Sequence, residues 1–189
     1  MINSFWKKSI HRALPICLLL AALLWGACSK TASSRIPSNG ERGTDPPPSA
    51  VMTWGEIAGR RIKLEIADTT DLRADGLAGR KSLGQDCGMI FVYGEADERA
   101  YWMRGCEIGL DIAFLDEAAR LIVVYSVDPP RSEDEALETY SSGGKARYVV
   151  EMTKGWFAAH QIRRGARLQF SPLLQRRADA LARSKSRQP

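Results

Sequence analysis

Short apolar runs, alternating or continuous, dominate the middle of the chain and are typical of β-strands. In one stretch polar and apolar residues alternate, which puts Ile62, Leu64 and Ile66 on one strand face. Other runs are rich in Val, Ile, Phe and Tyr, the residues that strands favour. Together these runs predict strands over residues 61–66, 88–93, 100–104, 112–115, 121–127, 147–152 and 167–170.

Two short helices are expected between these strands. The Asp-Thr-Thr sequence at 68–70 can cap a helix N-terminus, so a helix is predicted over 71–77. A second helix, over 154–160, would carry Trp156 and Phe157 onto the core. Seven or eight short strands with two short helices predict a mainly β (α+β) fold. The expected sheet is small and antiparallel, either closed like a barrel or packed like a sandwich.

The segments next to the strands differ from them in composition. Residues 128–145 hold a Pro-Pro pair, an acidic run and a Gly-Gly pair, which predict a long loop. Residues 172–189 are basic and poor in apolar side chains, so we expect a disordered tail there. The β-rich domain is therefore predicted to cover residues 51–171.

The N-terminus has the pattern of an export signal. Lys7, Lys8 and Arg12 precede a mostly apolar run over residues 13–25. This run is too short for a transmembrane helix, which needs about 20 residues, and it matches the apolar centre of a cleaved signal. We therefore predict a signal peptide over residues 1–27.

The residues after the apolar run, Leu-Trp-Gly-Ala-Cys at 24–28, resemble a bacterial lipobox, whose cysteine is lipidated after cleavage. Trp25 stands where that pattern has an aliphatic residue, so cleavage before Cys28 without lipidation is the alternative. Residues 28–50 are rich in Ser, Pro, Gly and charge, which predicts a flexible tether behind a lipid anchor. Ser29 resembles the signal for transport onward, which favours an outer-membrane lipoprotein facing the periplasm.

The remaining cysteines suggest a disulfide. Cys17 lies in the predicted signal and Cys28 would be lipidated, which leaves Cys87 and Cys106. Because exported proteins fold in an oxidising compartment, a Cys87–Cys106 bridge is predicted, with two separate thiols as the alternative.

The formal net charge of +5 overstates how basic the domain is. Residues 28–171 carry 19 basic and 21 acidic side chains, a net charge of −2. Nucleic-acid binding requires a clustered basic surface, so no nucleic-acid partner is predicted.

Seven short blocks follow one another along the domain, over residues 76–80, 88–92, 101–104, 110–116, 146–151, 155–157 and 162–165. In sequence, order and spacing these blocks resemble the domain of unknown function 192 family, over about residues 60–171. The resemblance implies a compact, mostly β domain of bacteria and archaea, often exported, with no established activity. Where the family usually reads Lys-Asn-Thr after Trp-Met, this chain has Arg-Gly-Cys at 104–106. A ligand contact made by that polar loop would therefore be changed or lost here.

Asp111 interrupts an apolar strand, between Leu110 and Ile112. A buried carboxylate needs a partner, and Arg80 or Arg104 could supply one. We therefore expect a structural ion pair, with a ligand-binding acid as the alternative.

Candidate binding residues are few. Trp102 and Arg104 could form an amphipathic rim, since Trp and Arg are enriched at binding hot spots; with Asp111 and Arg80 they complete the candidate set. His160 is the histidine left after processing, and one His with two Cys is too few for zinc, which takes three or four such ligands. No metal, cofactor or catalytic residue is predicted.

Two functions remain open from the sequence. The first is a non-enzymatic binding module, displayed from the membrane, for a cell-wall glycan, a peptide or another envelope protein. The alternative is a hydrolase or transferase that acts through Asp111 with a second carboxylate, Asp116 or Glu151. Paired carboxylates perform acid–base chemistry when their environments separate their pKa values.

Overall fold

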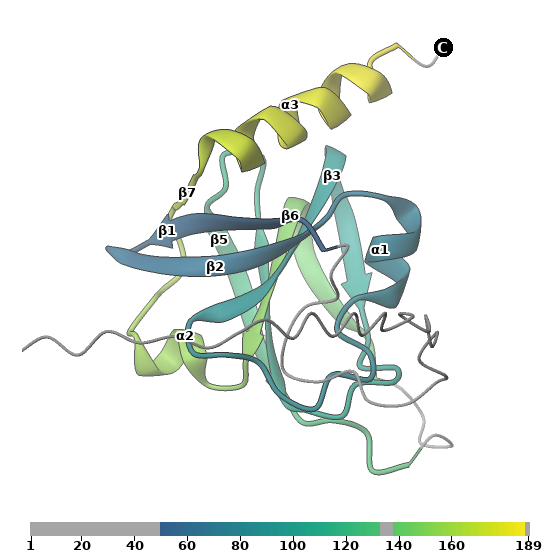
Figure 1. Cartoon of the computed structure of the whole chain (residues 1–189), viewed down its shortest axis with the longest axis vertical. Coiled ribbons are helices and arrows are strands. Elements are labelled where there is room, and N and C mark those ends of the chain that lie inside the picture. The colour runs from purple at the N-terminus through teal and green to yellow at the C-terminus, as the bar shows by residue number, and fades with distance from the viewer. Residues whose placement is uncertain (1–49, 133–137, 188–189) are drawn as a thin grey trace, which may run out of the picture. The chain divides into compact units, whose positions relative to one another are not determined.

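The computed structural model describes residues 50–132 and 138–187, and there it contains a seven-stranded sheet and three helices (Figure 1). The strand order is β5-β4-β6-β3-β2-β1-β7. The predicted signal peptide, Cys28 and almost all of the predicted tether lie outside the described residues. The strands are β1 Met52–Ile57, β2 Arg60–Ala67, β3 Cys87–Tyr101, β4 Leu110–Leu115, β5 Leu121–Val127, β6 Tyr140–Thr153 and β7 Leu168–Phe170. The helices are α1 Thr70–Asp75, α2 Trp156–Ala159 and α3 Pro172–Lys185.

The mainly β prediction is confirmed, with a correction to strand direction. The sheet is curled and mixed, because β2 and β3 pair in parallel while the other pairs are antiparallel. Parallel neighbours need a crossover connection, and α1 with the loop after it provides this connection from β2 to β3.

The central strands are buried on both faces. Val149 and Val150 are neighbours in β6, yet they belong to two different hydrophobic clusters. Successive side chains of a strand point to opposite faces, so each cluster lies on its own face of the sheet. Trp156 and Phe157 of α2 join the cluster of Val150, as the sequence predicted for these aromatic residues. We call the face that carries Val149 the pocket face, because a pocket opens on it.

Three strands, β1, β3 and β6, depart most from the prediction. β1 was missed, and β6 begins at Tyr140, inside the predicted loop. β3 runs through two predicted strands, joined by the polar stretch 94–99, and shifts register twice where it pairs with β6. Polar residues fit there because no residue of this stretch is buried, so the stretch has no apolar alternation to reveal it.

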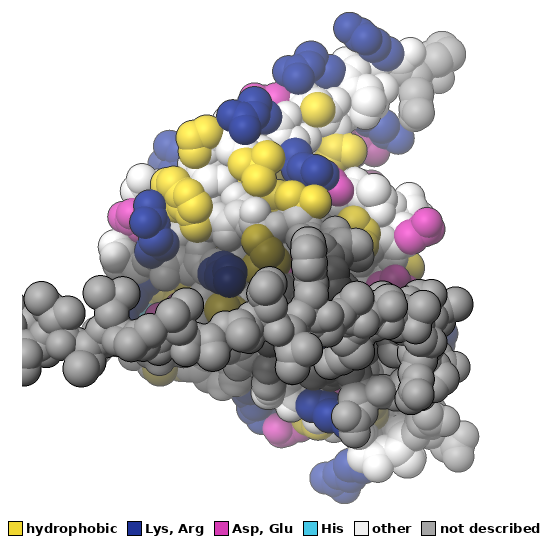
Figure 2. Space-filling view, viewed as in Figure 1, with side chains coloured by type: hydrophobic (Ala, Val, Ile, Leu, Met, Phe, Trp, Pro, Cys, Tyr) yellow, Lys and Arg dark blue, Asp and Glu magenta, His cyan; other side chains and the backbone are white. Residues whose placement is uncertain are grey.

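The prediction of a disordered tail is wrong, because α3 occupies most of it. Ser171 caps this helix by accepting the Leu174 N–H at 3.1 Å, and Leu174 and Ala178 are buried against the sheet. Arg177 forms an ion pair with Asp68. Lys and Arg side chains lie along the outer surface of α3 (Figure 2), so a basic composition conceals a narrow apolar stripe. Within the described ranges, no helix has the length and apolar character needed to cross a membrane.

Candidate functional site

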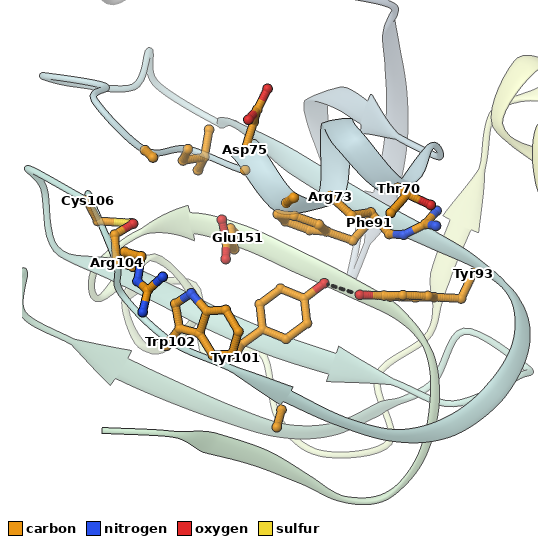
Figure 3. Close-up of a pocket in the computed structure, with 15 residues that line it drawn as sticks. Thr70, Arg73, Asp75, Phe91, Tyr93, Tyr101, Trp102, Arg104, Cys106 and Glu151 are labelled. Carbon is orange, nitrogen blue, oxygen red and sulfur yellow. Dashed lines mark hydrogen bonds between the residues drawn. The ribbon is translucent and has the colours of Figure 1, made fainter. Parts of the chain in front are cut away.

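A pocket of about 310 Å³ lies on the pocket face, between α1 and the far end of β3 (Figure 3). Residues far apart in the sequence line it, from α1, β3, β6 and the loop after β3. The lining side chains that bear charge, a polar group or an aromatic ring are Thr70, Arg73, Asp75, Phe91, Tyr93, Tyr101, Trp102, Arg104, Cys106 and Glu151.

Aromatic rings from β3 form one wall of the pocket. Tyr101 meets the rings of Phe91 and Phe114 edge to face, with centroids 5.2 and 5.5 Å away. Its hydroxyl group lies 2.8 Å from that of Tyr93. Trp102 follows directly and is 55% exposed. We use the term aromatic wall for Phe91, Tyr93, Tyr101 and Trp102.

Glu151 is the deepest ionisable group in this pocket. It lies on β6, paired across the sheet with Met89 of β3 and Ile112 of β4, so apolar neighbours flank it on both sides. Its side chain is buried, with a relative exposure of 5%. Among the described residues, no hydrogen bond or ion pair is formed by its carboxyl group. Burial raises the pKa of the Glu151 carboxyl group to about 8, so the acid is mostly neutral at pH 7.

The groups around Glu151 also stay protonated. Burial, and then the charge of Glu151, raise the pKa of the Cys106 thiol to about 12. Burial and the adjacent Tyr93 raise the pKa of Tyr101 well above its usual value, and Glu151 adds to the effect. A thiol acts as a nucleophile in its thiolate form, so Cys106 is poorly suited to covalent catalysis.

Two arginines line the pocket near the aromatic wall. Arg73 donates to the Val92 carbonyl at 3.0 Å, and its guanidinium lies 4.8 Å from the Tyr93 ring centre. The exposed Arg104 lies 5.7 Å from the ring centre of Trp102. The structure thus places two of the sequence-predicted binding residues, Trp102 and Arg104, at this pocket.

The other two predicted residues are elsewhere. Arg80 is buried and pairs with Glu65 at 2.7 Å. Burial raises the pKa of Glu65 although Arg80 opposes the shift. Asp111 is fully buried, as predicted, but its predicted pairing with Arg80 or Arg104 is wrong. Neither Arg80 nor Asp111 lines the pocket.

Asp111 instead fixes the start of α2. Its carboxylate accepts the backbone N–H groups of Gly155, at 2.8 Å, and Phe157, at 3.0 Å. The hydroxyl of Ser126 donates the third bond. Two backbone N–H groups and one hydroxyl group therefore donate the hydrogen bonds that the predicted arginine would have donated. Since Ile112 pairs with Glu151 on the pocket face, its neighbour Asp111 points to the opposite face.

The predicted disulfide is not formed in this structure, where Cys87 and Cys106 are free cysteines. Cys87 packs beside Gly84, whereas Cys106 lines the pocket. The His160 ring contacts that of Trp156 in a tilted arrangement, with centroids 4.5 Å apart. No cluster of three or more His, Cys, Asp or Glu side chains suited to a metal occurs in the part of the chain that is described.

Sequence reasoning missed most of the pocket. Glu151 entered the sequence analysis only as a possible second carboxylate, although it interrupts an apolar run just as Asp111 does. The sequence does not group Tyr93, Tyr101 and Arg73, because these residues come together only in the folded protein, where α1 and β3 line the same pocket.

The fold and the pocket define a small mixed β domain with a buried, unpaired acid beside an aromatic wall. The chain belongs to the DUF192 family, described as "Uncharacterized ACR", whose family model matches residues 53–170. No curated protein matches the chain significantly.

Two solved structures resemble the chain. One is described as a putative transcription regulator from Sinorhizobium meliloti 1021, with 23% identity and a TM-score of 0.60. The match covers 66% of this chain and 98% of that one. The other is a protein of unknown function from Novosphingobium aromaticivorans DSM 12444, with 26% identity and a TM-score of 0.57. That match covers 77% of this chain and all of the other, and both similarities support the fold.

Proposed function

We propose that this protein is a membrane-anchored envelope protein whose DUF192 domain is a non-enzymatic binding module, with the pocket at Glu151 as its ligand site. The observation that carries the proposal is the unpaired carboxyl group of Glu151, which is buried in the pocket wall. Burying an ionisable group without a partner is costly. A ligand that pairs with Glu151 would offset this free-energy cost, which explains why an unpaired acid is buried in the pocket.

The pocket also has the composition of a binding site. Ligand pockets combine a mainly apolar or aromatic lining with a few convergent polar groups. Here the aromatic wall is the aromatic lining, and the polar groups are those of Glu151, Arg73 and Arg104. A volume of about 310 Å³ suits a small molecule or one side chain of a larger partner.

Binding is favoured over the alternative of a hydrolase or transferase. That mechanism needs Asp111 and a second carboxylate at one site, but Asp111 and Glu151 point to opposite faces of the sheet. Asp116 accepts the Arg120 N–H at 2.8 Å in the turn between β4 and β5. Cys106 does not offer a nucleophile in their place, because the pKa of its thiol is raised to about 12.

The membrane anchor rests on the sequence around Cys28. We expect the protein extracted from membranes to begin with a lipid-modified Cys28, and Cys28→Ser to abolish the lipid. Intact-mass and N-terminal peptide mass spectrometry measure this directly. An unmodified, soluble product of the wild-type chain would contradict the anchor and leave the pocket proposal untouched.

The ligand site is tested by filling the pocket. Ala74 is an exposed pocket residue on α1, and Ala74→Phe would occupy part of the cavity. The purified full-length protein is immobilised and exposed to an extract of its own envelope, and retained compounds are identified by mass spectrometry. We expect at least one compound to be retained by the wild type and lost with Ala74→Phe.

The matched control for this capture is Glu98→Gln, which changes an exposed carboxylate of β3 that does not line the pocket. Its captured compounds should match those of the wild type. If Ala74→Phe captures the same compounds in the same amounts as the wild type, the pocket is not the ligand site.

A further inference from the structure

The chemistry around Glu151 also indicates what kind of ligand the pocket takes, provided that the pocket is the ligand site. We propose that the bound group is an alkylammonium cation, which inserts beside the aromatic wall and forms an ion pair with the Glu151 carboxylate. Lysine side chains and other primary amines carry such a group.

The first argument is the position of the acid. Glu151 lies deeper than the charged groups of α1 and of the loop after β3: its exposure is 5%, whereas Arg104 and Asp75 are exposed. Figure 3 shows the Glu151 carboxyl group between Cys106 and the rings of Phe91 and Tyr101. An anionic ligand placed there would be repelled by the Glu151 carboxylate, whereas a cationic ligand would form an ion pair with it.

The second argument is the aromatic wall. The face of an aromatic ring carries negative charge density and attracts cations, most strongly when water is excluded. This wall already attracts cations from within the protein: the guanidinium groups of Arg73 and Arg99 lie 4.8 and 3.9 Å from the Tyr93 ring centre. A pocket that combines ring faces with one buried carboxylate is suited to an ammonium group.

The third argument is the absence of an internal cation at Glu151. The described arginines of the pocket interact with other groups: Arg73 with Val92 and Tyr93, and Arg104 with Trp102. Elsewhere on the pocket face, the buried acid Glu65 has its own arginine, Arg80. Glu151 therefore differs from Glu65 in that no described cation pairs with it, so a cation that balances its ionised form would come from a ligand.

Binding would move one proton. The charged and titratable groups that line the pocket with Glu151 are Arg73 and Asp75 of α1, Tyr93 and Tyr101 of β3, and Arg104 and Cys106 of the following loop. The buried acid holds a proton at pH 7, because its pKa is about 8. The inserted ammonium group stabilises the ionised form of Glu151, so the carboxyl group of Glu151 releases its proton to solvent. The cation itself keeps its protons.

The test measures binding of butylammonium chloride by the full-length protein, with sodium butyrate and 1-butanol as probes of similar size. We expect only butylammonium to bind specifically, with close to one proton released at pH 7 in an unbuffered pH-stat titration. Its affinity should rise up to about tenfold per pH unit from pH 5 and level off above pH 8, where Glu151 is already ionised.

Three variants test whether this binding takes place at the pocket. Glu151→Gln should abolish both the binding and the proton release, and Glu98→Gln should leave both unchanged. Ala74→Phe should weaken binding without removing the acid, so the conclusion does not depend on the folding of one variant.

The outcomes separate the inference from the proposed function. If butyrate or butanol binds instead and Ala74→Phe abolishes it, the pocket is a ligand site but its ligand is not an ammonium ion. If butylammonium does not bind while envelope compounds are still captured through the pocket, the inference is likewise overturned. If Ala74→Phe changes neither capture nor probe binding, both the inference and the proposed function fail.

Discussion

Replacing Asp111 with alanine is expected to lower the free energy of unfolding by about 3–5 kcal/mol. The loss arises because the backbone N–H groups of Gly155 and Phe157 lose the carboxylate that accepts them in a buried site. Each buried donor left without an acceptor costs about 1–3 kcal/mol. Ser126 loses its acceptor as well, but its residue is exposed and water can replace the bond.

Urea unfolding of the full-length protein, followed by tryptophan fluorescence, measures this effect. Asp111→Asn retains one carbonyl acceptor and should lose less stability than Asp111→Ala. The control is Asp128→Ala, which removes an exposed ion pair with Lys154 and should change stability by less than about 1 kcal/mol. A wild-type-like unfolding curve for Asp111→Ala would contradict the structural role.

The sequence could identify both unusual carboxylates but not their roles. Asp111 and Glu151 each interrupt an apolar strand, and strand pairing decides what surrounds them. Because Ile112 is the partner of Glu151, the two acids point to opposite faces, one toward α2 and the other into the pocket. Local sequence does not specify which residues face each other across a sheet, so a carboxylate pair was a reasonable prediction that the structure does not support.

The missed strand, β1, lacks the apolar alternation on which the prediction depends. In β1 the inward positions are Thr53, Gly55 and Ile57, so only the last is a large apolar residue. A Cβ atom at Gly55 would lie 2.8 Å from a side-chain carbon of Leu168, so this small residue allows β7 to pair closely. Tertiary packing thus selects residues that a strand pattern would reject.

The helix α3 was missed for a related reason. Its few apolar residues matter because they contact the sheet, and the composition of the whole segment reports mainly its exposed face. Leu174 and Ala178 are four residues apart, which is the spacing of one helical face. Two buried residues and a capping serine help to hold the helix on the sheet, together with the Arg177–Asp68 ion pair, but they are too few to stand out in the sequence.

The stability of the wild-type protein is expected to fall by roughly 3–5 kcal/mol as the pH rises from 5 to 8. In the folded protein the pKa of Glu151 is about 8, above its ordinary value of 4.5. Between these two values the unfolded chain releases the proton while the folded protein keeps it, so rising pH favours unfolding. Below pH 4.5 both states are protonated, and above pH 8 both are ionised. Glu65, whose pKa is also raised, acts in the same direction.

The variant Glu151→Gln, which cannot ionise, should remove most of this pH dependence and leave the smaller contribution of Glu65. At pH 5 it should match the wild type, and at pH 8 it should be more stable by several kcal/mol, on the order of the wild-type loss. Urea unfolding at pH 5, 6, 7 and 8 measures both profiles, with Glu98→Gln as the control that keeps the wild-type slope. Parallel profiles for wild type and Glu151→Gln would show that Glu151 is not the buried acid described here. A variant that gains stability at pH 8 and loses the bound ammonium ion would show that this carboxylate weakens the fold and serves binding.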